Sequence, residues 1–244
     1  AKLYTDCGIM TCDPQIGEDA TAVFNMMSGY SEPLNWNRLS VAPLWLRGKF
    51  LRLIGRETMH ARAGKKASIM AKMNSLCDKD IIAALYEASC AGVKIRLVVR
   101  GICSLKAGIP GLSENIEVRS IVGNFLEHSR IFIFENDGCE EIYMGSADWM
   151  PRNLDRRVEI LFPVLRPELK ERVRHIMELE LADNMKAHVL MPDGTYEKPD
   201  RRGKAPVNSQ MIFCEEAIAA AEEERRRAEG GTKSRLFVPV ESHE

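Results

Sequence analysis

His128 and Arg130 stand two residues apart at the start of an otherwise apolar segment, FLEHSRIFIFENDG (125–138). Because residues i and i+2 of a strand face the same side, the two side chains would point together, with Phe132 and Phe134 continuing that face. Arginine holds two phosphate oxygens in a fork and keeps its charge. Histidine attacks phosphorus or moves a proton. The spacing therefore predicts a site for a doubly charged anion.

Further polar residues follow in the same frame. Glu135 lies five residues after Arg130, and the run GSADWMPRNLDRRVE (145–159) comes after a DG turn. Within that run Ser146 would offer a hydroxyl donor, while a carboxylate such as Glu135 would orient the imidazole of His128. A lone histidine is most often structural, but His, Arg and Gly-Ser in one frame favour a functional site.

Two other strand ends present groups that bind phosphate. Arg100 ends the apolar strand KIRLVVRG, and ligands of open α/β sheets bind beyond the carboxyl ends of strands. Gly101 would then let the backbone come close to a ligand. Lys72 and Asn74 share one face of the preceding strand, where lysine is a point-charge phosphate contact and asparagine an adaptable donor. A surface arginine and a solvated strand edge are the simpler alternatives for these residues.

The elements that would position these groups alternate between strand and helix in the first half of the chain. Such alternation indicates a largely parallel sheet with covering helices. The second half is richer in strands, and its DG dipeptide predicts a hairpin. Hydrophobic periodicity predicts helices over 17–30, 45–64, 78–92, 166–183 and 209–229, and strands over 39–44, 67–76, 93–101, 116–122, 129–136, 141–147 and 158–164, with a surface loop over 191–206.

Composition excludes several classes of protein. The 244 residues have a formal net charge of −1, so no overall field attracts nucleic acid or a membrane surface. The 7 cysteines include no Cys-x-x-Cys pair, which favours reduced thiols in the cytoplasm over disulfides or zinc. No apolar run reaches the roughly 18 residues of a membrane span. The chain begins in mid-pattern without Met, so we expect it to be part of a longer protein.

Five segments together resemble the bacterial histidine-dependent polyphosphate kinases and run in that family's order over almost the whole chain: YTD, LVVRGICSL, IVGNFLEHSRIFIFENDG, YMGSADWMPRNLDRRVE and VNSQ. The resemblance implies an α/β fold with a phospholipase-D-like mixed sheet flanked by helices, in a family with two related catalytic halves. It assigns residues 1–16 to the end of the preceding catalytic domain, 17–229 to the C-terminal catalytic domain and 230–244 to a mobile tail.

The resemblance also implies a reaction. The γ-phosphate of ATP passes to a histidine and then, reversibly, to the end of a polyphosphate chain, with Mg²⁺ as cofactor. The phosphorylated histidine would lie upstream of Ala1, so this chain alone would be inactive. His128 matches the family's second essential histidine, Arg100 an ATP-phosphate contact, and Tyr4 a nucleotide contact whose ring can stack on the base.

The resemblance further implies partners and a location. The partners are ATP or ADP, inorganic polyphosphate, the upstream domains of the same chain and further copies in a homo-oligomer, without nucleic acid. The location is the cytoplasm, with association to a membrane as a complex as a further possibility.

Two other functions stay open on the sequence. One is a phosphodiesterase of the phospholipase D or nuclease kind, although Arg130 stands where that pattern has Lys and Trp149 where it has Asn. The other is a non-catalytic module that binds polyphosphate or forms an oligomer contact, suggested by the helix EEAIAAAEEERRRAE.

Overall fold

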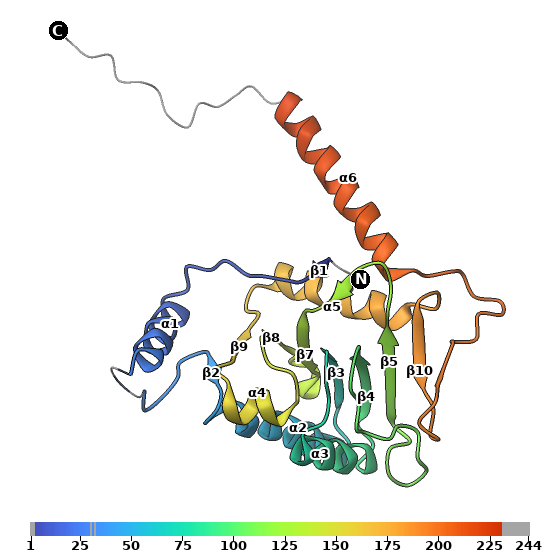
Figure 1. Ribbon diagram of the computed structural model, residues 1–244, viewed down its shortest axis with the longest axis horizontal. Helices are drawn as coiled ribbons and strands as arrows, with labels where there is room; N and C mark the ends of the chain where they lie inside the picture. Colours follow the sequence, from blue (N-terminus) through green and yellow to red (C-terminus); the bar gives the residue numbers. More distant parts are fainter. Residues whose placement is uncertain (1–2, 30, 32, 231–244) are drawn as a thin grey trace.

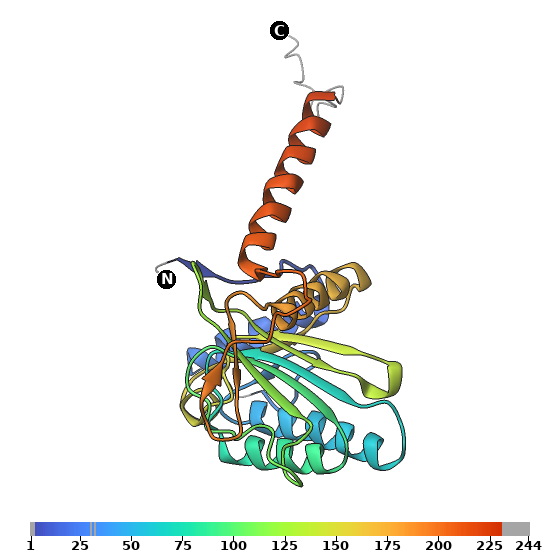
Figure 2. The same ribbon diagram turned by 90° about the vertical axis from the view of Figure 1, so that its right-hand side faces the viewer.

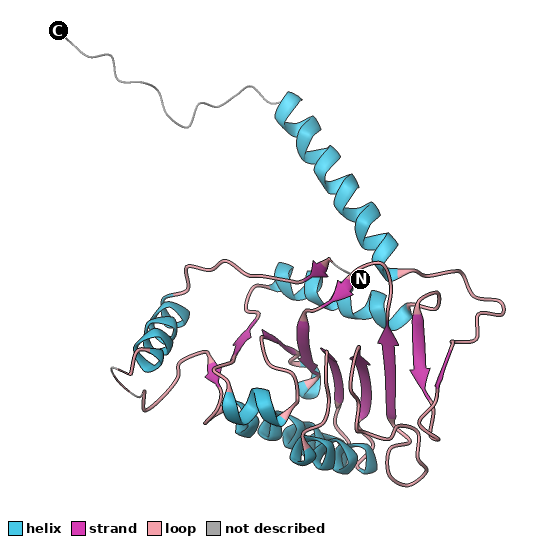
Figure 3. Ribbon diagram, in the orientation of Figure 1, coloured by secondary structure: helices cyan, strands magenta, loops and turns pink. Residues whose placement is uncertain are grey.

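The computed structural model describes residues 3–29, 31 and 33–230, so the predicted tail lies, apart from its first residue, outside the described part. Its helices occupy the segments predicted from periodicity, apart from one short additional helix over residues 151–156 (Figure 3). They are α1 (Pro14–Met27), α2 (Leu46–Arg62), α3 (Lys79–Cys90), α4 (Pro151–Arg156), α5 (Pro167–Ala182) and α6 (Ser209–Gly230).

Nine strands form one sheet in the order β11-β10-β5-β4-β3-β7-β8-β9-β2, and two short strands, β1 and β6, pair separately. The strands are β1 (Tyr4–Thr5), β2 (Ser40–Val41), β3 (Ser68–Met73), β4 (Lys94–Val99), β5 (Ile116–Ile121), β6 (Leu126–Glu127), β7 (Arg130–Phe134), β8 (Glu141–Gly145), β9 (Ile160–Pro163), β10 (Ala187–Leu190) and β11 (Tyr196–Glu197).

The sheet is mixed, which confirms the fold class that the resemblance implies. Only β3, β4 and β5 run parallel to one another, and every other neighbouring pair in this sheet is antiparallel. The expectation of a largely parallel sheet is therefore wrong outside this centre. The reason is connectivity. A short turn returns the chain from β7 to β8, and a segment that contains only the short helix α4 returns it from β8 to β9, whereas β3 and β4 are joined through the longer helix α3.

Local caps explain where the helices begin. Asp78 caps α3, its side chain accepting from the Ile81 amide at 3.1 Å. Asp13 does the same for α1 and is followed by Pro14, a residue suited to the first helical turn. As a result α1 begins three residues before the predicted start at Gly17, and the domain boundary expected between residues 16 and 17 falls inside this helix.

The core lies on both faces of the sheet, between the α2–α3 pair on one side and α5 on the other (Figure 2). Phe132 and Phe134 of β7 share the face that packs on α2, as predicted. The Phe132 ring centroid lies 4.7 Å from that of Phe50 and 5.3 Å from that of Trp149. The alternate residues of β7, Ile131 and Ile133, pack beneath α5. This two-sided burial fixes the register of β7 and hence the direction of the residues before it.

One edge of the sheet collects the predicted polar residues. Because β7 is antiparallel to β3 and β8, its beginning lies at the same edge as the ends of β3, β4 and β8. The small β1–β6 pair lies above this edge, beside the start of α6 (Figure 1). From there α6 extends away from the body, and its residues from Glu215 to Ala228 are exposed. The fold thus places the histidine, arginine and asparagine residues of the sequence prediction together.

Candidate functional site

His128 is the first of the two residues between β6 and β7, and it contacts the N-terminal segment. Its backbone amide donates to the Thr5 carbonyl at 3.0 Å, and its Nδ1 lies 3.1 Å from Asp6 Oδ2. Asp6 therefore orients the imidazole. The expectation that Glu135 would do so is wrong, because Glu135 lies at the opposite end of β7, where its amide donates to the Ser68 carbonyl.

Tyr4, for which the resemblance implies a nucleotide contact, lies next to His128. The pairing of β1 with β6 places the two rings edge to face, with their centroids 5.0 Å apart. Tyr4 is 68% exposed, so most of its surface is available to a ligand. Ring character alone would not have singled out this residue, since a tyrosine in a short strand is usually a core residue.

Arg130 joins His128 to a buried carboxylate that the sequence reasoning left without a role. Its Nη1 donates to the His128 carbonyl at 2.9 Å and lies 3.0 Å from His128 Nδ1. Its Nε donates to Asp148 Oδ1 at 3.1 Å. Asp148 stands inside the quoted run GSADW, but only the fold shows that its carboxylate faces Arg130. The guanidinium thus holds the histidine in place as well as adding positive charge.

The same carboxylate connects to Arg100 through Asn74. Asp148 Oδ1 accepts from the backbone amide of Asn74 at 2.8 Å, and the side-chain oxygen of Asn74, Oδ1, accepts from Arg100 Nε at 2.9 Å. Gly101 permits this approach, since a Cβ there would lie 2.9 Å from the Asn74 carbonyl oxygen. We call the connected set Arg100, Asn74, Asp148, Arg130, His128 and Asp6 the relay. It joins residues from separate strand ends into one hydrogen-bonded chain, with Asn74 acting inside it instead of at a solvated edge.

Lys72 differs from its predicted role. Its side chain is 2% exposed, and its Nζ lies 2.9 Å from Glu127 Oε2 and 2.9 Å from Glu180 Oε1. Its ammonium is therefore enclosed by protein carboxylates and does not reach a phosphate in this structure. Sequence reasoning missed this because Glu180 comes from α5, on the far side of the sheet.

Ser146 lies with His128 and Arg130 in a cavity of about 410 Å³, which Arg157 also lines. The Ser146 amide donates to the Ile160 carbonyl, and its hydroxyl accepts from the Ile160 amide at 3.1 Å. The hydroxyl keeps its own proton for a ligand under this arrangement. Four of the predicted residues, Tyr4, Lys72, Asn74 and Arg100, do not line this cavity.

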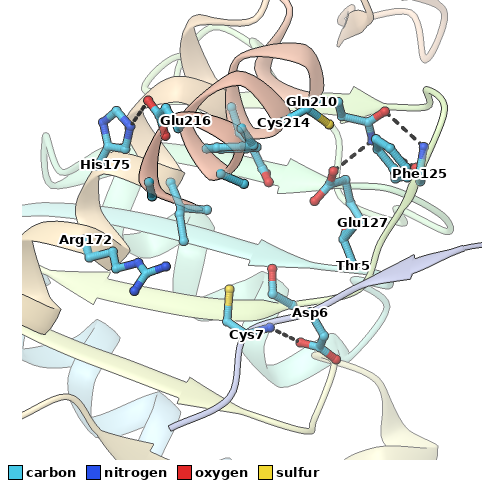
Figure 4. Close-up of a pocket in the computed structure, with 16 residues that line it drawn as sticks. Thr5, Asp6, Cys7, Phe125, Glu127, Arg172, His175, Gln210, Cys214 and Glu216 are labelled. Atoms are coloured by element: carbon cyan, nitrogen blue, oxygen red, sulfur yellow. Dashed lines mark hydrogen bonds and ion pairs between the residues drawn. The ribbon is translucent and has the colours of Figure 1, made fainter. Parts of the chain in front are cut away.

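A second cavity of about 630 Å³ lies behind the histidine segment, between the N-terminal residues, α5 and the first turns of α6 (Figure 4). Gln210 and Glu127 are among the residues that line it. Asp6 and Cys7 line this cavity and also the first one, so they lie between the two cavities. The two cavities therefore lie on either side of a single extended segment.

Several negative findings apply to residues 3–29, 31 and 33–230. No group of three or more His, Cys, Asp or Glu side chains in these residues could hold a metal ion, so they give the predicted Mg²⁺ no support. Their helices include none that is long and apolar enough to cross a membrane. The seven cysteines, all within these residues, form no disulfide with one another.

Comparison with known proteins relates the chain to one family. The family model for the polyphosphate kinase C-terminal domain 2 matches residues 39–210. A polyphosphate kinase of Lactiplantibacillus plantarum is 47% identical over 242 residues, which are 99% of this chain and 34% of that protein. One of Synechocystis is 52% identical over 227 residues, 92% of this chain and 31% of that protein.

A solved structure agrees with these sequence matches. The crystal structure of polyphosphate kinase from Porphyromonas gingivalis aligns with a TM-score of 0.83 at 39% identity, over 88% of this chain and 33% of that one. The chain thus spans about a third of the length of the relatives it matches. These matches favour a kinase over the phosphodiesterase that the sequence left open. The chain belongs to the polyphosphate kinase family, in which it corresponds to the C-terminal domain 2.

Proposed function

We propose that this chain forms one wall of a phosphoryl-transfer site in a longer polyphosphate kinase, which moves the γ-phosphate of ATP reversibly to the end of a polyphosphate chain. The relay supports this proposal, because it fixes a histidine and two arginines from separate strands at one edge of the sheet. Phosphoryl transfer needs positioning and positive charge more than covalent chemistry from the protein. The relay meets both needs.

Arg100 and Arg130 have different tasks in this proposal. Arg130 directs its donors to Asp148 and to His128, so it positions the imidazole. Arg100 uses only Nε, towards Asn74, in the hydrogen bonds of the described residues. Its two terminal nitrogens are therefore the fork that holds phosphate oxygens of ATP or ADP. Tyr4 would stack its exposed ring on the nucleotide base.

His128 acts as an acid and base opposite the phosphorylated histidine, which the resemblance places in the upstream part of the protein. In the tautomer whose Nδ1–H donates to Asp6, Nε2 is the ring nitrogen that takes or gives the proton at the phosphate, and Arg130 Nη1 lies 3.3 Å from it. Ser146 would add a hydroxyl donor for polyphosphate in the cavity beside it. The chain by itself would bind phosphate groups without completing the transfer.

Cofactor and assembly are also part of the proposal. Mg²⁺ usually binds through one or two carboxylates together with substrate phosphates. In the longer protein Mg²⁺ would therefore be held largely by the phosphates of the substrates, with some of its protein ligands in the upstream part, as the resemblance implies. The longer protein would act in the cytoplasm as a homo-oligomer that does not bind nucleic acid.

The test uses the full-length protein and its conversion of ATP to polyphosphate. We expect His128→Ala to abolish turnover, whereas His175→Ala, which removes another histidine paired with a carboxylate, leaves it unchanged. Calorimetric titration of this chain with ATP should lose its binding signal in Arg100→Ala. Turnover by His128→Ala at the wild-type rate would overturn the proposal.

A further inference from the structure

We propose that Lys72 is a positioning residue for His128, because its buried ammonium holds the two residues on either side of the histidine. The inference rests on the proposed function of His128 and deepens it. The ammonium of Lys72 contacts neither the His128 nor the Arg130 side chain, so it would act only through the backbone segment that it holds.

The geometry resembles a clamp with the histidine between its two arms. Lys72 Nζ donates to Glu127 Oε2 at 2.9 Å and to Ser129 Oγ at 2.6 Å. Glu127 and Ser129 immediately precede and follow His128. Because side chains alternate along an extended chain, they point to one side while His128 points to the other. Lys72 therefore fixes the segment from the face opposite the imidazole.

A third contact connects the clamp to the helix behind the sheet. Lys72 Nζ lies 2.9 Å from Glu180 Oε1 of α5. This is an ion pair whose geometry leaves both Glu180 oxygens without a hydrogen bond among the described residues. All four members, Lys72, Glu127, Ser129 and Glu180, are buried. Replacing a buried ion pair by apolar side chains of the same volume often leaves the free energy of unfolding unchanged or raises it. We therefore assign this pair a role in fixing one arrangement of the segment, not in adding stability.

The charges favour a fixed pair within this group. Burial, together with the nearby Glu127, raises the pKa of Glu180 to about 7 against the opposing effect of Lys72. Burial opposes ionisation of Glu127 too, yet the charge of Lys72 and the hydrogen bonds from Lys72 and Gln210 together lower the pKa of that carboxyl. Lys72 and Glu127 are therefore the ionised pair near neutral pH, with Glu180 close to half protonated.

The other oxygen of Glu127 is held from α6. Gln210 Nε2 donates to Glu127 Oε1 at 2.8 Å and to the Phe125 carbonyl at 2.9 Å, while its Oε1 accepts from the Phe125 amide (Figure 4). A Cβ at Gly123 would lie 2.3 Å from Gln210 Oε1, so this contact requires glycine there. The segment that leads to His128 is thus held at the backbone of Phe125 and at the side chain of Glu127.

The test removes the clamp while keeping the volume of the core. Lys72→Met alone would leave Glu127 as an unpaired buried charge, and such losses destabilise strongly. The informative variant is therefore Lys72→Met combined with Glu127→Gln, which is neutral and nearly isosteric. The matched control is Arg56→Met combined with Glu141→Gln, which removes a helix-to-strand ion pair of 2.8 Å at the opposite end of β8.

In the full-length protein we expect the Lys72/Glu127 variant to lower kcat by about 10- to 100-fold, the loss expected for a misplaced catalytic group, with KM for ATP within about twofold. The control should change neither. In NMR spectra the imidazole resonances of His128 should shift or broaden in the Lys72/Glu127 variant only.

The outcomes separate the two proposals. If His128→Ala abolishes turnover while the Lys72/Glu127 variant keeps the wild-type kcat, the positioning role is refuted and the proposed function stands. If the control pair lowers kcat as much, the effect is general loss of structure and the positioning role is again refuted. If His128→Ala has no effect, the proposed function fails, and unchanged His128 resonances in the variant would then refute the clamp as well.

Discussion

Asp148 offers the sharpest test of the relay, because two different groups depend on its one carboxylate. Asp148→Ala removes the acceptor of the buried backbone amide of Asn74. It also removes the carboxylate that pairs with Arg130, whose side chain is 12% exposed. Breaking a buried ion pair costs about 3–5 kcal/mol, and an orphaned buried amide costs about 1–3 kcal/mol. The two losses share one site and do not add fully, so we expect about 4 kcal/mol of the free energy of unfolding to be lost.

A conservative variant separates the two contributions. Asp148→Asn keeps a side-chain oxygen that accepts from the backbone amide of Asn74 and loses only the negative charge that faces Arg130. We expect it to cost about 1.5–3 kcal/mol, the value of a hydrogen bond to a charged group. The assay is urea unfolding followed by tryptophan fluorescence, which reports on the buried Trp149 one residue away.

The matched control is Asp155→Ala, which also removes an arginine's carboxylate. Asp155 is 42% exposed, and its partner Arg47 keeps Asp78 at 2.9 Å. We expect a change below about 1 kcal/mol, as for surface ion pairs in general. If Asp148→Ala costs no more than this control, the carboxylate does not hold the relay together and the reasoning from its contacts is refuted.

Three further predictions concern the neighbourhood of the relay. The native state keeps on Glu180 a proton that the unfolded chain releases above its usual pKa of 4.5, so the contribution of Glu180 to the free energy of unfolding should fall by about 3 kcal/mol between pH 4.5 and 7. Urea unfolding of the wild type and of Glu180→Gln at both pH values measures this contribution as the difference between their changes, and equal changes would contradict the assignment. Gly123→Ala should destabilise the protein by about 1–3 kcal/mol in the same assay, because its Cβ overlaps Gln210 Oε1, and the added Gln210→Ala should relieve part of this cost. Tyr4→Phe should bind ATP in calorimetry as the wild type does, whereas Tyr4→Ala should bind it more weakly; equal binding by both would exclude stacking on the base.

Much of the layered fold follows from local pattern in the sequence. The apolar segments that became β3, β4 and β7 alternate with capped amphipathic helices, and burial of Phe132 and Phe134 follows from the period of two residues. Strand direction followed only in part. The DG dipeptide predicted the direct return from β7 to β8, whereas the antiparallel pairing of β7 with β3 joins segments distant in sequence and has no local signal.

The site was predictable in its residue types and less so in its contacts. His128, Arg130 and Arg100 were visible because a charged residue at the end of an apolar strand is unusual. The same reasoning misplaced Lys72, since a lysine beside apolar residues has the same appearance at a surface as in a buried ion pair. Its partner Glu180 lies on a helix distant in sequence, and the roles of Asp148 and Asp6 also depend on contacts that only the fold creates.

The pairing of β1 with β6 has a consequence for hydrogen exchange. Besides the short β1–β6 pairing, the contacts that hold the N-terminal segment over the site among the described residues come from the Leu126 amide, the His128 amide, the Thr5 hydroxyl and the pairing of Asp6 with the His128 ring. A two-stranded pair of this length is marginal by itself, so it can detach at a small fraction of the free energy of global unfolding. We expect the amides of Leu126 and His128 to exchange through this local opening, far faster than those of β3 and β4. Tyr4 and Asp6 would then leave and rejoin the imidazole while the strands beneath stay intact.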